Sequence, residues 1–496
     1  MYPDPSVCRA GDKFYMVCST FHFFPGVPLF ESDDMINWHQ IGHVLTRKSQ
    51  LLLDGIGASG GIYAPNIRYH NGRFYMVVTN VSNIGNFYVW TDDIYGEWSD
   101  PIKVEQSGID PTLFFDDDGK TYFVSNGNDE NGTGYIQISE IDIETGKKLS
   151  ENKPLWYGTG GRYIEAPHVY KIGEYYYVLD AEGGTEYGHM VNYARSRNLM
   201  GPYEPCPYNP VLTNRNLGGY QLQGAGHGDL VEAPDGTWWF CHLAFRQIDK
   251  WLPFHHLGRE TCVQPVVWKD GWFYIGSLVA DNKSVTGTTG TALLETEGFD
   301  SHKTGKQNFS YEKTFENLTL KNDWNYLRNP DYDNYKLNED SLELKGTEIT
   351  LSDAASPTWI GVRACEFTES FECTVECKGG EAGISIMMDE NHHYEAFILQ
   401  TENIITGNLR LRIGPADYIK TSIPLSSNKA KIKIVSDNYK YDFYITDGEK
   451  EIKLGSAETR YLSSEVACGF TGVYNGLYAV GADAYAKFTD LKISHE

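Results

Sequence analysis

Three carboxylate residues stand at similar places in three short, similar stretches of the sequence. Asp4 lies in YPDPSV, Asp110 in GIDPTL and Glu165 in YIEAPHV, each one or two residues before a proline and a short apolar run. A histidine, His227, precedes a comparable run in GHGDLV. Clustered carboxylates suit two kinds of chemistry, which are oxygen ligation of a cation such as calcium and the paired acid and base work that cleaves a glycosidic bond. Either chemistry requires the chain to bring these residues together.

A recurring pattern indicates how the chain could do so. A small turn residue is followed by aromatic and β-branched residues, as in a tight turn that enters a strand. The five copies are DKFYMV (12–17), GRFYMV (72–77), GKTYFV (119–124), GEYYYV (173–178) and GTWWFC (236–241). Their starts are 47 to 63 residues apart, which is the size of a four-stranded propeller blade. A sixth copy, GWFYIG (271–276), is expected to supply a closing strand.

The repeat predicts an all-β fold that begins with a five-bladed β-propeller over residues 1–283. The first strand of each blade lines the axis of such a ring, so the residues at the blade entrances converge. These entrance residues are Asp4, Ala64, Asp110, Glu165 and His227. A single Asp-Pro pair is more often a turn starter than a functional site. Several carboxylates aimed at one axis repel one another and are costly to desolvate, so their shared place in the repeat favours function.

Aromatic residues near the entrances favour glycoside chemistry over metal binding. FHFFPG (21–26) lies beside the first entrance strand, and Tyr63 comes just before the second entrance. Trp238 and Trp239 follow the last entrance strand. Aromatic faces suit the apolar faces of sugar rings.

Composition limits the class of partner. The net charge of −25 over 496 residues argues against nucleic acid or anionic membranes as partners and suits a neutral ligand. No apolar run reaches membrane-spanning length, and no basic segment followed by an apolar one suggests a signal peptide. Nine scattered cysteines complete no metal site, and we expect reduced thiols and a cytoplasmic protein.

The second half of the chain has a different character. SVTGTTGT (284–291) is polar and without periodicity, so residues 284–309 are expected to be a linker. Alternating strands follow, for example AKIKIV (430–435), with a hairpin signal at Asp447-Gly448, and they predict a β-sandwich over residues 310–496. His392 and His393, in DENHHYE, are expected in a solvated hairpin turn rather than at a metal site.

The motifs around the five entrances resemble those of glycoside hydrolase family 43. The resembling stretches are YPDPSVCRAGDKFYMV, GGIYAPNIRYHNGRFYMV, GIDPTLFFDDDGKTYFV, RYIEAPHVYKIGEYYYV and LQGAGHGDLVEAPDGTWWF. SPTWIGVRACEF and GFTGVYNGLYAVGADA are similar to the concanavalin-like β-sandwich of that family's β-xylosidase branch. The resemblance covers nearly the whole chain and implies a β-xylosidase or α-L-arabinofuranosidase on a five-bladed propeller.

The resemblance also implies roles for the carboxylates. Asp4 matches the general base that activates water, and Glu165 matches the general acid that protonates the leaving oxygen. Asp110 matches the residue that orients the acid and keeps its pKa raised. This division agrees with chemistry, since an acid that works near neutral pH must hold its proton.

Five further residues match substrate-binding positions of the family. Arg259, in LGRET, matches an arginine that contacts sugar hydroxyls and the carboxylates, and Phe24 matches an aromatic wall. Tyr63 stands where relatives often have tryptophan, and Phe470, in GFTGVY, matches an aromatic that the sandwich can donate. His227 matches an axial histidine that holds a water or a hydrated calcium in some members. We expect no required cofactor and leave a structural calcium near His227 open.

The function expected from these observations is an inverting exo-acting hydrolase that releases xylose from the non-reducing end of β-1,4-xylo-oligosaccharides. An α-L-arabinofuranosidase, or an enzyme with both activities, stays open because the two sugars present similar hydroxyl arrangements. A propeller that only binds sugar is a more distant alternative. The resembling branch also implies a possible homo-oligomer.

Overall fold

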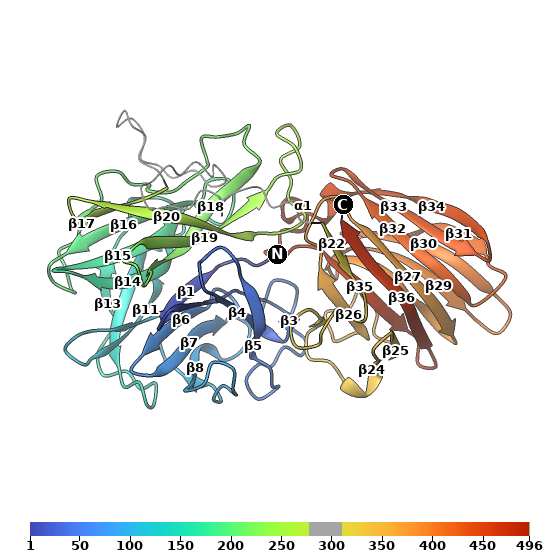
Figure 1. Cartoon of the computed structure of the whole chain (residues 1–496), viewed down its shortest axis with the longest axis horizontal. Coiled ribbons are helices and arrows are strands. Elements are labelled where there is room, and N and C mark those ends of the chain that lie inside the picture. Colours follow the sequence, from blue (N-terminus) through green and yellow to red (C-terminus); the bar gives the residue numbers. More distant parts are fainter. Residues whose placement is uncertain (277–309, 496) are drawn as a thin grey trace.

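The computed structural model describes residues 1–276 and 310–495, and the predicted linker at 284–309 lies outside these ranges. Two β-rich domains lie side by side, with the N-terminus at their junction (Figure 1). The first domain consists of five four-stranded antiparallel sheets, so the predicted five-bladed propeller is confirmed.

Each blade is built from four consecutive strands, apart from a two-residue strand, β3, that blade I leaves out. From the inner strand outward the blades are: blade I, β1 (Ser6–Ala10), β2 (Lys13–Val17), β4 (Gly26–Ser32) and β5 (His39–Leu45); blade II, β6 (Asn66–His70), β7 (Arg73–Asn80), β8 (Gly85–Thr91) and β9 (Ile102–Lys103); blade III, β10 (Thr112–Phe115), β11 (Thr121–Asn128), β12 (Gly134–Ile141) and β13 (Lys153–Trp156); blade IV, β14 (Glu165–Ile172), β15 (Tyr175–Glu182), β16 (Met190–Ser196) and β17 (Glu204–Pro205); blade V, β18 (Leu222–Glu232), β19 (Trp238–Arg246), β20 (Glu260–Lys269) and β21 (Trp272–Ile275).

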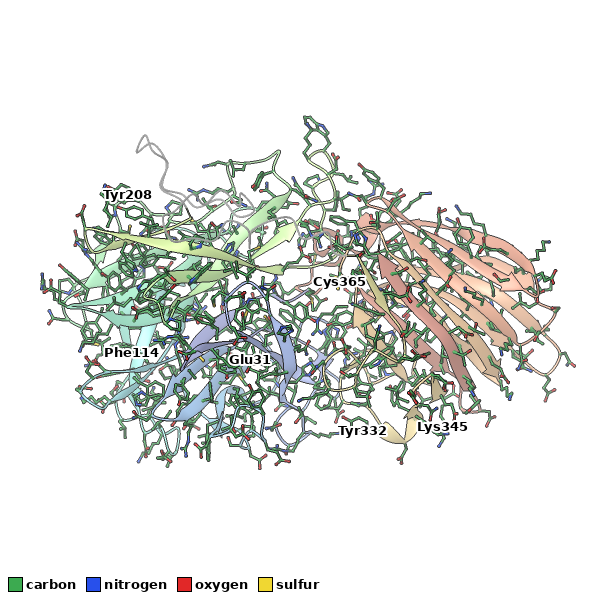
Figure 2. The ribbon with its side chains drawn as sticks, viewed as in Figure 1. Glu31, Phe114, Tyr208, Tyr332, Lys345 and Cys365 are labelled. Carbon is green, nitrogen blue, oxygen red and sulfur yellow. The ribbon has the colours of Figure 1, made fainter. Side chains whose placement is uncertain are left out.

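Apolar residues of the repeated motif hold neighbouring blades together. Phe114, labelled in Figure 2, lies on β10 and packs against Tyr176 of β15, with ring centroids 6.1 Å apart. Val124, Val169 and Val178 complete the same buried cluster between blades III and IV. Because side chains alternate along a strand, each inner strand sends one face toward each neighbouring blade.

A buried ion pair joins the inner strands around the axis of the propeller. Asp229 on β18 is fully buried and accepts hydrogen bonds from the Ser6 hydroxyl at 2.6 Å and the Val7 amide at 3.1 Å. Arg68 on β6 donates to both Asp229 oxygens, at 2.7 and 3.2 Å, and the Tyr170 hydroxyl of β14 also donates to Asp229. One carboxylate therefore joins the inner strands of four blades.

The sixth copy of the repeat does not close the ring. It forms β21, the outermost strand of blade V. Blades I and V are joined instead by the first residues of the chain, because the Tyr2 amide donates to the Arg259 carbonyl at 3.1 Å and the Thr261 hydroxyl donates to the Tyr2 carbonyl at 2.7 Å.

The second domain is a sandwich of two eight-stranded antiparallel sheets, as the sequence predicts. The first sheet contains β24 (Tyr335–Leu337), β25 (Ser341–Lys345), β36 (Tyr485–His495), β27 (Ser370–Lys378), β32 (Lys429–Ser436), β33 (Lys440–Asp447) and β34 (Lys450–Glu458), with β22 (Tyr311–Lys313) paired to β36. The second contains β3 (Phe23–Phe24), β23 (Asn325–Leu327), β26 (Trp359–Arg363), β35 (Tyr474–Val480), β28 (Gly380–Asp389), β29 (His392–Gln400), β30 (Ile405–Ile413) and β31 (Ala416–Pro424). The helical turns are η2 (Tyr332–Asn334), η3 (Thr459–Leu462) and α1 (Ser464–Ala467).

The two domains share a sheet. Strand β3 comes from the propeller segment of the chain, yet it pairs with β23 of the sandwich through Phe24 with Tyr326 and Phe23 with Leu327. Next to this pair, the Asn329 side chain accepts from the Leu53 amide at 2.6 Å and donates to the Leu51 carbonyl at 2.9 Å. The sandwich is therefore hydrogen-bonded directly to the loop that precedes blade II.

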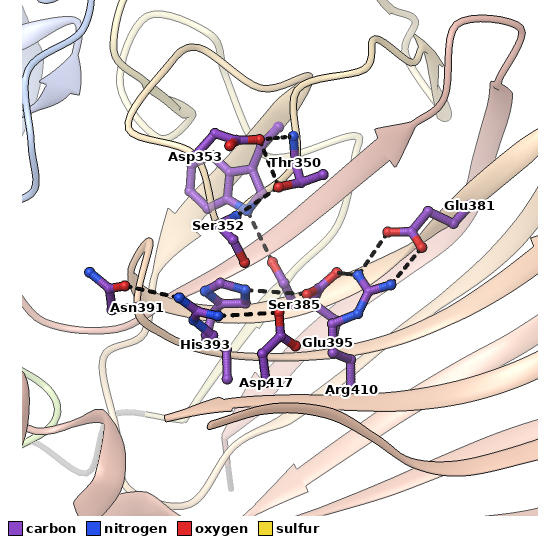
Figure 3. A network of polar contacts seen from close by, with 12 residues as sticks. Thr350, Ser352, Asp353, Glu381, Ser385, Asn391, His393, Glu395, Arg410 and Asp417 are labelled. Carbon is purple, nitrogen blue, oxygen red and sulfur yellow. Dashed lines mark hydrogen bonds and ion pairs between the residues drawn. The ribbon is translucent and has the colours of Figure 1, made fainter. Parts of the chain in front are cut away.

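The histidine pair in DENHHYE lies at a hairpin, as expected, but it is not solvated. His393 is fully buried at the start of β29, where one ring nitrogen lies 3.0 Å from the Asp389 carbonyl and the other 3.3 Å from Glu395. Glu395 also accepts from Arg410 at 2.9 Å, and Arg410 reaches Glu381 (Figure 3). His393 is thus linked through Glu395 to Arg410 and Glu381, which lie on the strands beside β29. The local sequence pattern does not predict this network.

The described residues contain no helix with the length and apolar character needed to cross a bilayer. All nine cysteines are free thiols.

Replacing Asp229 should destabilise the propeller strongly. Asp229→Asn keeps the shape of the side chain but leaves the Arg68 charge buried without its partner, a change that costs about 3–5 kcal/mol. We expect unfolding at a lower urea concentration, with the midpoint measured by tryptophan fluorescence. Glu232→Gln, at an exposed position of the same strand, is the matched control and should leave the midpoint unchanged. Equal midpoints for the two variants would contradict the role assigned to the axial ion pair.

Candidate active site

Four of the five blade entrances carry the same unusual backbone conformation. The φ angles of Asp4, Asp110, Ala166 (the residue after Glu165) and His227 are 54°, 54°, 53° and 40°. These values lie in the left-handed region that residues other than glycine seldom adopt. At His227 the kink coincides with a bulge in the pairing of β18 with β19. Backbone conformations of this kind concentrate at functional sites. Here they turn entrance side chains toward a common region.

Asp4 is held by a buried arginine. Arg259, 5% exposed, donates to both Asp4 oxygens, with Nη2 to Oδ2 at 3.2 Å. The Ser19 hydroxyl also donates to Oδ2, and the His227 ring nitrogen lies 3.8 Å from Oδ1. A carboxylate offers about four acceptor positions, so Oδ1 retains one that can accept a proton from a bound water.

These contacts fix the charge of Asp4. Burial alone would raise its pKa, but the Arg259 guanidinium, His227 and the hydrogen bond from Ser19 outweigh burial and hold the pKa of Asp4 below its usual range. Asp4 is therefore ionised at neutral pH, and its negative charge acts on the other carboxyls.

The pKa values of Glu165 and Asp110 are shifted in the opposite direction, upward. Burial, followed by the charge of Asp4, raises the pKa of Glu165 to about 7, although Arg259 opposes the rise. Burial, then the charges of Glu165 and Asp4, raises the pKa of Asp110 well above its usual range. Burial and the charge of Asp4, rather than Asp110, are thus the main causes of the raised pKa of Glu165. Because Asp110 and Glu165 disfavour each other's ionised forms, the pair holds at least one proton near neutral pH.

Three aromatic rings adjoin these carboxyls. Phe21 lies 5.7 Å from Tyr63 and 6.0 Å from Phe470, and Tyr63 lies 5.9 Å from Phe470, measured between ring centroids. The Arg259 guanidinium lies 5.6 Å from the centre of Phe21 and 5.8 Å from that of Phe470. Burial, then the charges of Asp110 and Glu165, raises the pKa of Tyr63.

Phe24 is not the aromatic wall that we expected. It belongs to the large hydrophobic core that residues of both domains share, and its backbone pairs with Tyr326 of the sandwich. Phe21, three residues earlier, occupies the place beside Tyr63. Phe21 forms a bridge with Ile62, the residue before Tyr63, and has a left-handed φ of 53°.

The sandwich supplies Phe470 through a segment anchored on the propeller. The Phe470 amide donates to the Ser59 hydroxyl at 2.8 Å, and its carbonyl accepts from Arg259 at 3.3 Å. Glu465 of α1 binds the His255 ring at 2.7 Å and the His255 amide at 3.1 Å. These contacts bring Phe470 of the sandwich to the guanidinium that binds Asp4.

The surroundings of His227 do not fit a directly bound calcium ion. Calcium takes six to eight oxygen ligands, but Asp4 is occupied by Arg259 and Ser19, and Asp229 by Arg68. Burial lowers the pKa of His227 despite the opposing charge of Asp4. Within residues 1–276 and 310–495, no group of three or more His, Cys, Asp or Glu side chains is arranged to hold a metal.

Two contributors were missed by the sequence analysis. Ser19 supplies a hydrogen bond to Asp4, and the Thr185 hydroxyl accepts from Arg259 Nη1 at 3.0 Å. Ser19 follows β2 and Thr185 follows β15, the second strands of their blades. They stand two and three residues after the ends of these strands, so a hydroxyl residue shortly after a second strand is a signal that could have found both.

Comparison with known proteins agrees with this geometry. The family model described as "Glycosyl hydrolases family 43" matches residues 1–273. The model described as "Beta xylosidase C-terminal Concanavalin A-like domain" matches residues 312–494. The chain belongs to glycoside hydrolase family 43. It is a member in which the propeller and the sandwich are both present.

Relatives of this glycoside hydrolase carry two activities in their names. It is 38% identical over 97% of its length, and 90% of the relative, to a non-reducing end α-L-arabinofuranosidase of Bacteroides ovatus. It is 35% identical over 96% of its length, and 94% of the relative, to a xylosidase/arabinosidase of Butyrivibrio fibrisolvens. A solved xylan β-1,4-xylosidase of Bacillus halodurans superimposes with a TM-score of 0.88 at 30% identity, covering 100% of this chain and 98% of the other.

The raised pKa of Glu165 predicts a pH-dependent stability difference. A carboxyl whose pKa is higher when folded destabilises the protein as pH rises, from the ordinary value near 4.5 through about 7. Glu165→Gln removes this cost. The variant should gain on the order of 2–3 kcal/mol over the wild type between pH 4.5 and pH 8, seen by calorimetry as a growing difference in melting temperature. Glu186→Gln, at an exposed site nearby, should show no such growth. A constant difference for Glu165→Gln would contradict the raised pKa.

Proposed function

We propose that this family 43 enzyme is an inverting, exo-acting hydrolase that releases xylose from the non-reducing end of β-1,4-xylo-oligosaccharides. The observation that carries the proposal is the contrast between two carboxyls at one site. Asp4 is kept ionised by Arg259, and Glu165 keeps its proton up to about pH 7. An inverting glycosidase needs one group of each kind.

In the proposed reaction Glu165 is the general acid. Its proton passes to the glycosidic oxygen as the bond from that oxygen to the anomeric carbon breaks. Asp4 is the general base, and accepts at Oδ1 a proton from the water that attacks the anomeric carbon from the opposite side. Asp110, whose own pKa is raised by burial and by the charge of Glu165, is assigned to orient the acid. Arg259 keeps Asp4 ionised, and we also assign it to the sugar hydroxyls.

The exo-acting mode rests on Phe470. Together with Phe21 and Tyr63 it forms an aromatic group beside the carboxyls, and it comes from a different domain. A ring placed there blocks extension of a chain past the terminal sugar, so we assign these three residues to the terminal sugar. His227 is assigned to the same sugar through the water that its neutral ring can hold. We propose no part for calcium in the reaction, because the nearby carboxylates already have cationic partners.

A second candidate is the release of terminal α-L-arabinofuranose. The full-length similarity to a non-reducing end α-L-arabinofuranosidase favours it, and the same acid and base would serve. An enzyme with both activities is consistent with the name of the Butyrivibrio relative.

The decisive experiment is a proton NMR time course on xylobiose. We expect α-xylose to appear first and to mutarotate later, because single displacement by water inverts the β-configuration. Early β-xylose would mean retention and a different use of the carboxyls. If no xylose forms, the same run on an α-L-arabinofuranoside separates the second candidate from a propeller that only binds sugar.

The pH dependence of kcat/KM tests the assigned roles. Activity requires protonated Glu165, so the rate should fall as pH rises through about 7, whereas the low pKa of Asp4 moves the acidic limb below the usual range of an aspartate. Glu165→Gln should lower kcat by about 10²- to 10⁴-fold and remove the alkaline limb, while sugar binding by calorimetry persists. An unchanged alkaline limb in that variant would refute Glu165 as the acid.

A further inference from the structure

The loop that precedes Glu165 presents an exposed aromatic ring. Tyr163 is 55% exposed, although Ile164 beside it is buried. Its φ angle is 54°, and for a bulky residue this left-handed conformation is a genuine outlier. Such strain persists only where the surrounding structure enforces it, and it concentrates at functional sites.

The conformation of this loop is fixed by hydrogen bonds to the end of β15 and the residue after it. Glu182, 1% exposed, accepts hydrogen bonds from the Thr159 amide at 2.6 Å and from the Gly161 amide. The Gly183 amide donates to the Arg162 carbonyl at 2.7 Å. The Glu182 carboxylate and the Gly183 amide thus hold the loop on both sides of Gly160, and Tyr163 follows directly.

The ring of Tyr163 is braced but not covered. The Arg162 guanidinium lies 4.7 Å from the ring centre and donates to the Tyr163 hydroxyl at 2.7 Å. Gly184 meets the ring edge, since a Cβ placed there would lie 3.2 Å from Cδ2. A braced, exposed aromatic ring is a preformed surface with little rotamer freedom left to lose on binding.

Two chain connections lead from this surface to the carboxyls. Tyr163 is two residues from Glu165. Gly184, which touches the ring, is followed by Thr185, whose hydroxyl accepts from Arg259, the partner of Asp4. The acid acts on the leaving oxygen, so we expect a ring on the loop that leads into the acid to lie on the side where the leaving group departs.

We infer that Tyr163 is the stacking surface for the leaving-group sugar, the xylose ring directly after the scissile bond. This inference rests on the proposed function, which supplies Glu165 as the acid. Arg162 holds the ring in position, and no aromatic residue of the Phe21, Tyr63 and Phe470 group is needed for this second sugar. Stacking of this kind acts on ground state and transition state alike, so its loss raises KM and leaves kcat nearly unchanged.

The test compares two substrates that differ only in the leaving group. Xylobiose carries a sugar there, whereas β-D-xylopyranosyl fluoride carries a single atom that cannot stack. Tyr163→Ala should raise KM for xylobiose by about 3- to 10-fold, the effect of one aromatic stacking contact, and leave kcat and KM for the fluoride unchanged. Tyr163→Phe keeps the ring and should behave as wild type. Tyr157→Ala, which removes a comparably exposed ring that contacts Tyr135 instead, is the matched control.

Each other outcome overturns the inference in a distinguishable way. An unchanged KM for xylobiose in Tyr163→Ala refutes the stacking role while wild-type turnover upholds the proposed function. A parallel loss on both substrates means that the ring only supports the loop. A change in oligomeric state on size-exclusion chromatography assigns the exposed ring to an interface between copies. A wild-type enzyme inactive on both xylosides refutes the proposed function and this inference together.

Discussion

The hydrogen-bonded ion pair between Asp4 and Arg259 is the interaction on which the site depends. It joins the first blade to the last across 255 residues of sequence, and the same guanidinium reaches Thr185 in blade IV and the Phe470 carbonyl in the sandwich. Three carboxyls in a buried space cannot all be ionised. Because Arg259 fixes the charge on Asp4, the remaining proton is left to Glu165 and Asp110, so one residue sets the division of labour between the acids.

The sandwich is a structural part of the site rather than an appendage. Its segment after α1 crosses to the propeller so closely that a side chain at Gly472 would collide with the Leu257 carbonyl, at 2.2 Å. The same segment leads to Phe470 and ends at Val473, whose amide binds the His256 carbonyl. Small residues and backbone hydrogen bonds permit this approach, and they set the position of a ring that lies beside Arg259.

The sequence predicted the parts of the site that follow from repetition. Asp4, Asp110 and Glu165 could be found because each holds the same place in a repeated unit, whatever fold closes the ring. Phe21 could not be separated from Phe24 in this way, because both rings lie in one short aromatic stretch and the pairing of Phe24 with Tyr326 of the sandwich depends on the tertiary fold. Arg259 carries no local signal, and it was identified only through family resemblance.

The shared strand β3 has a consequence for the order in which the protein is made. Phe23 and Phe24 leave the ribosome early, but their partners, Tyr326 and Leu327, follow about 300 residues later. At 5–20 residues per second this interval is roughly 15–60 s. During it the nascent chain holds an unpaired strand, next to a propeller whose last blade is also absent for most of that time. A two-residue strand exposes little edge to neighbouring chains. The shortness of β3 therefore protects the nascent protein from association at the stage when the first blade is complete and its final partners have yet to be synthesised.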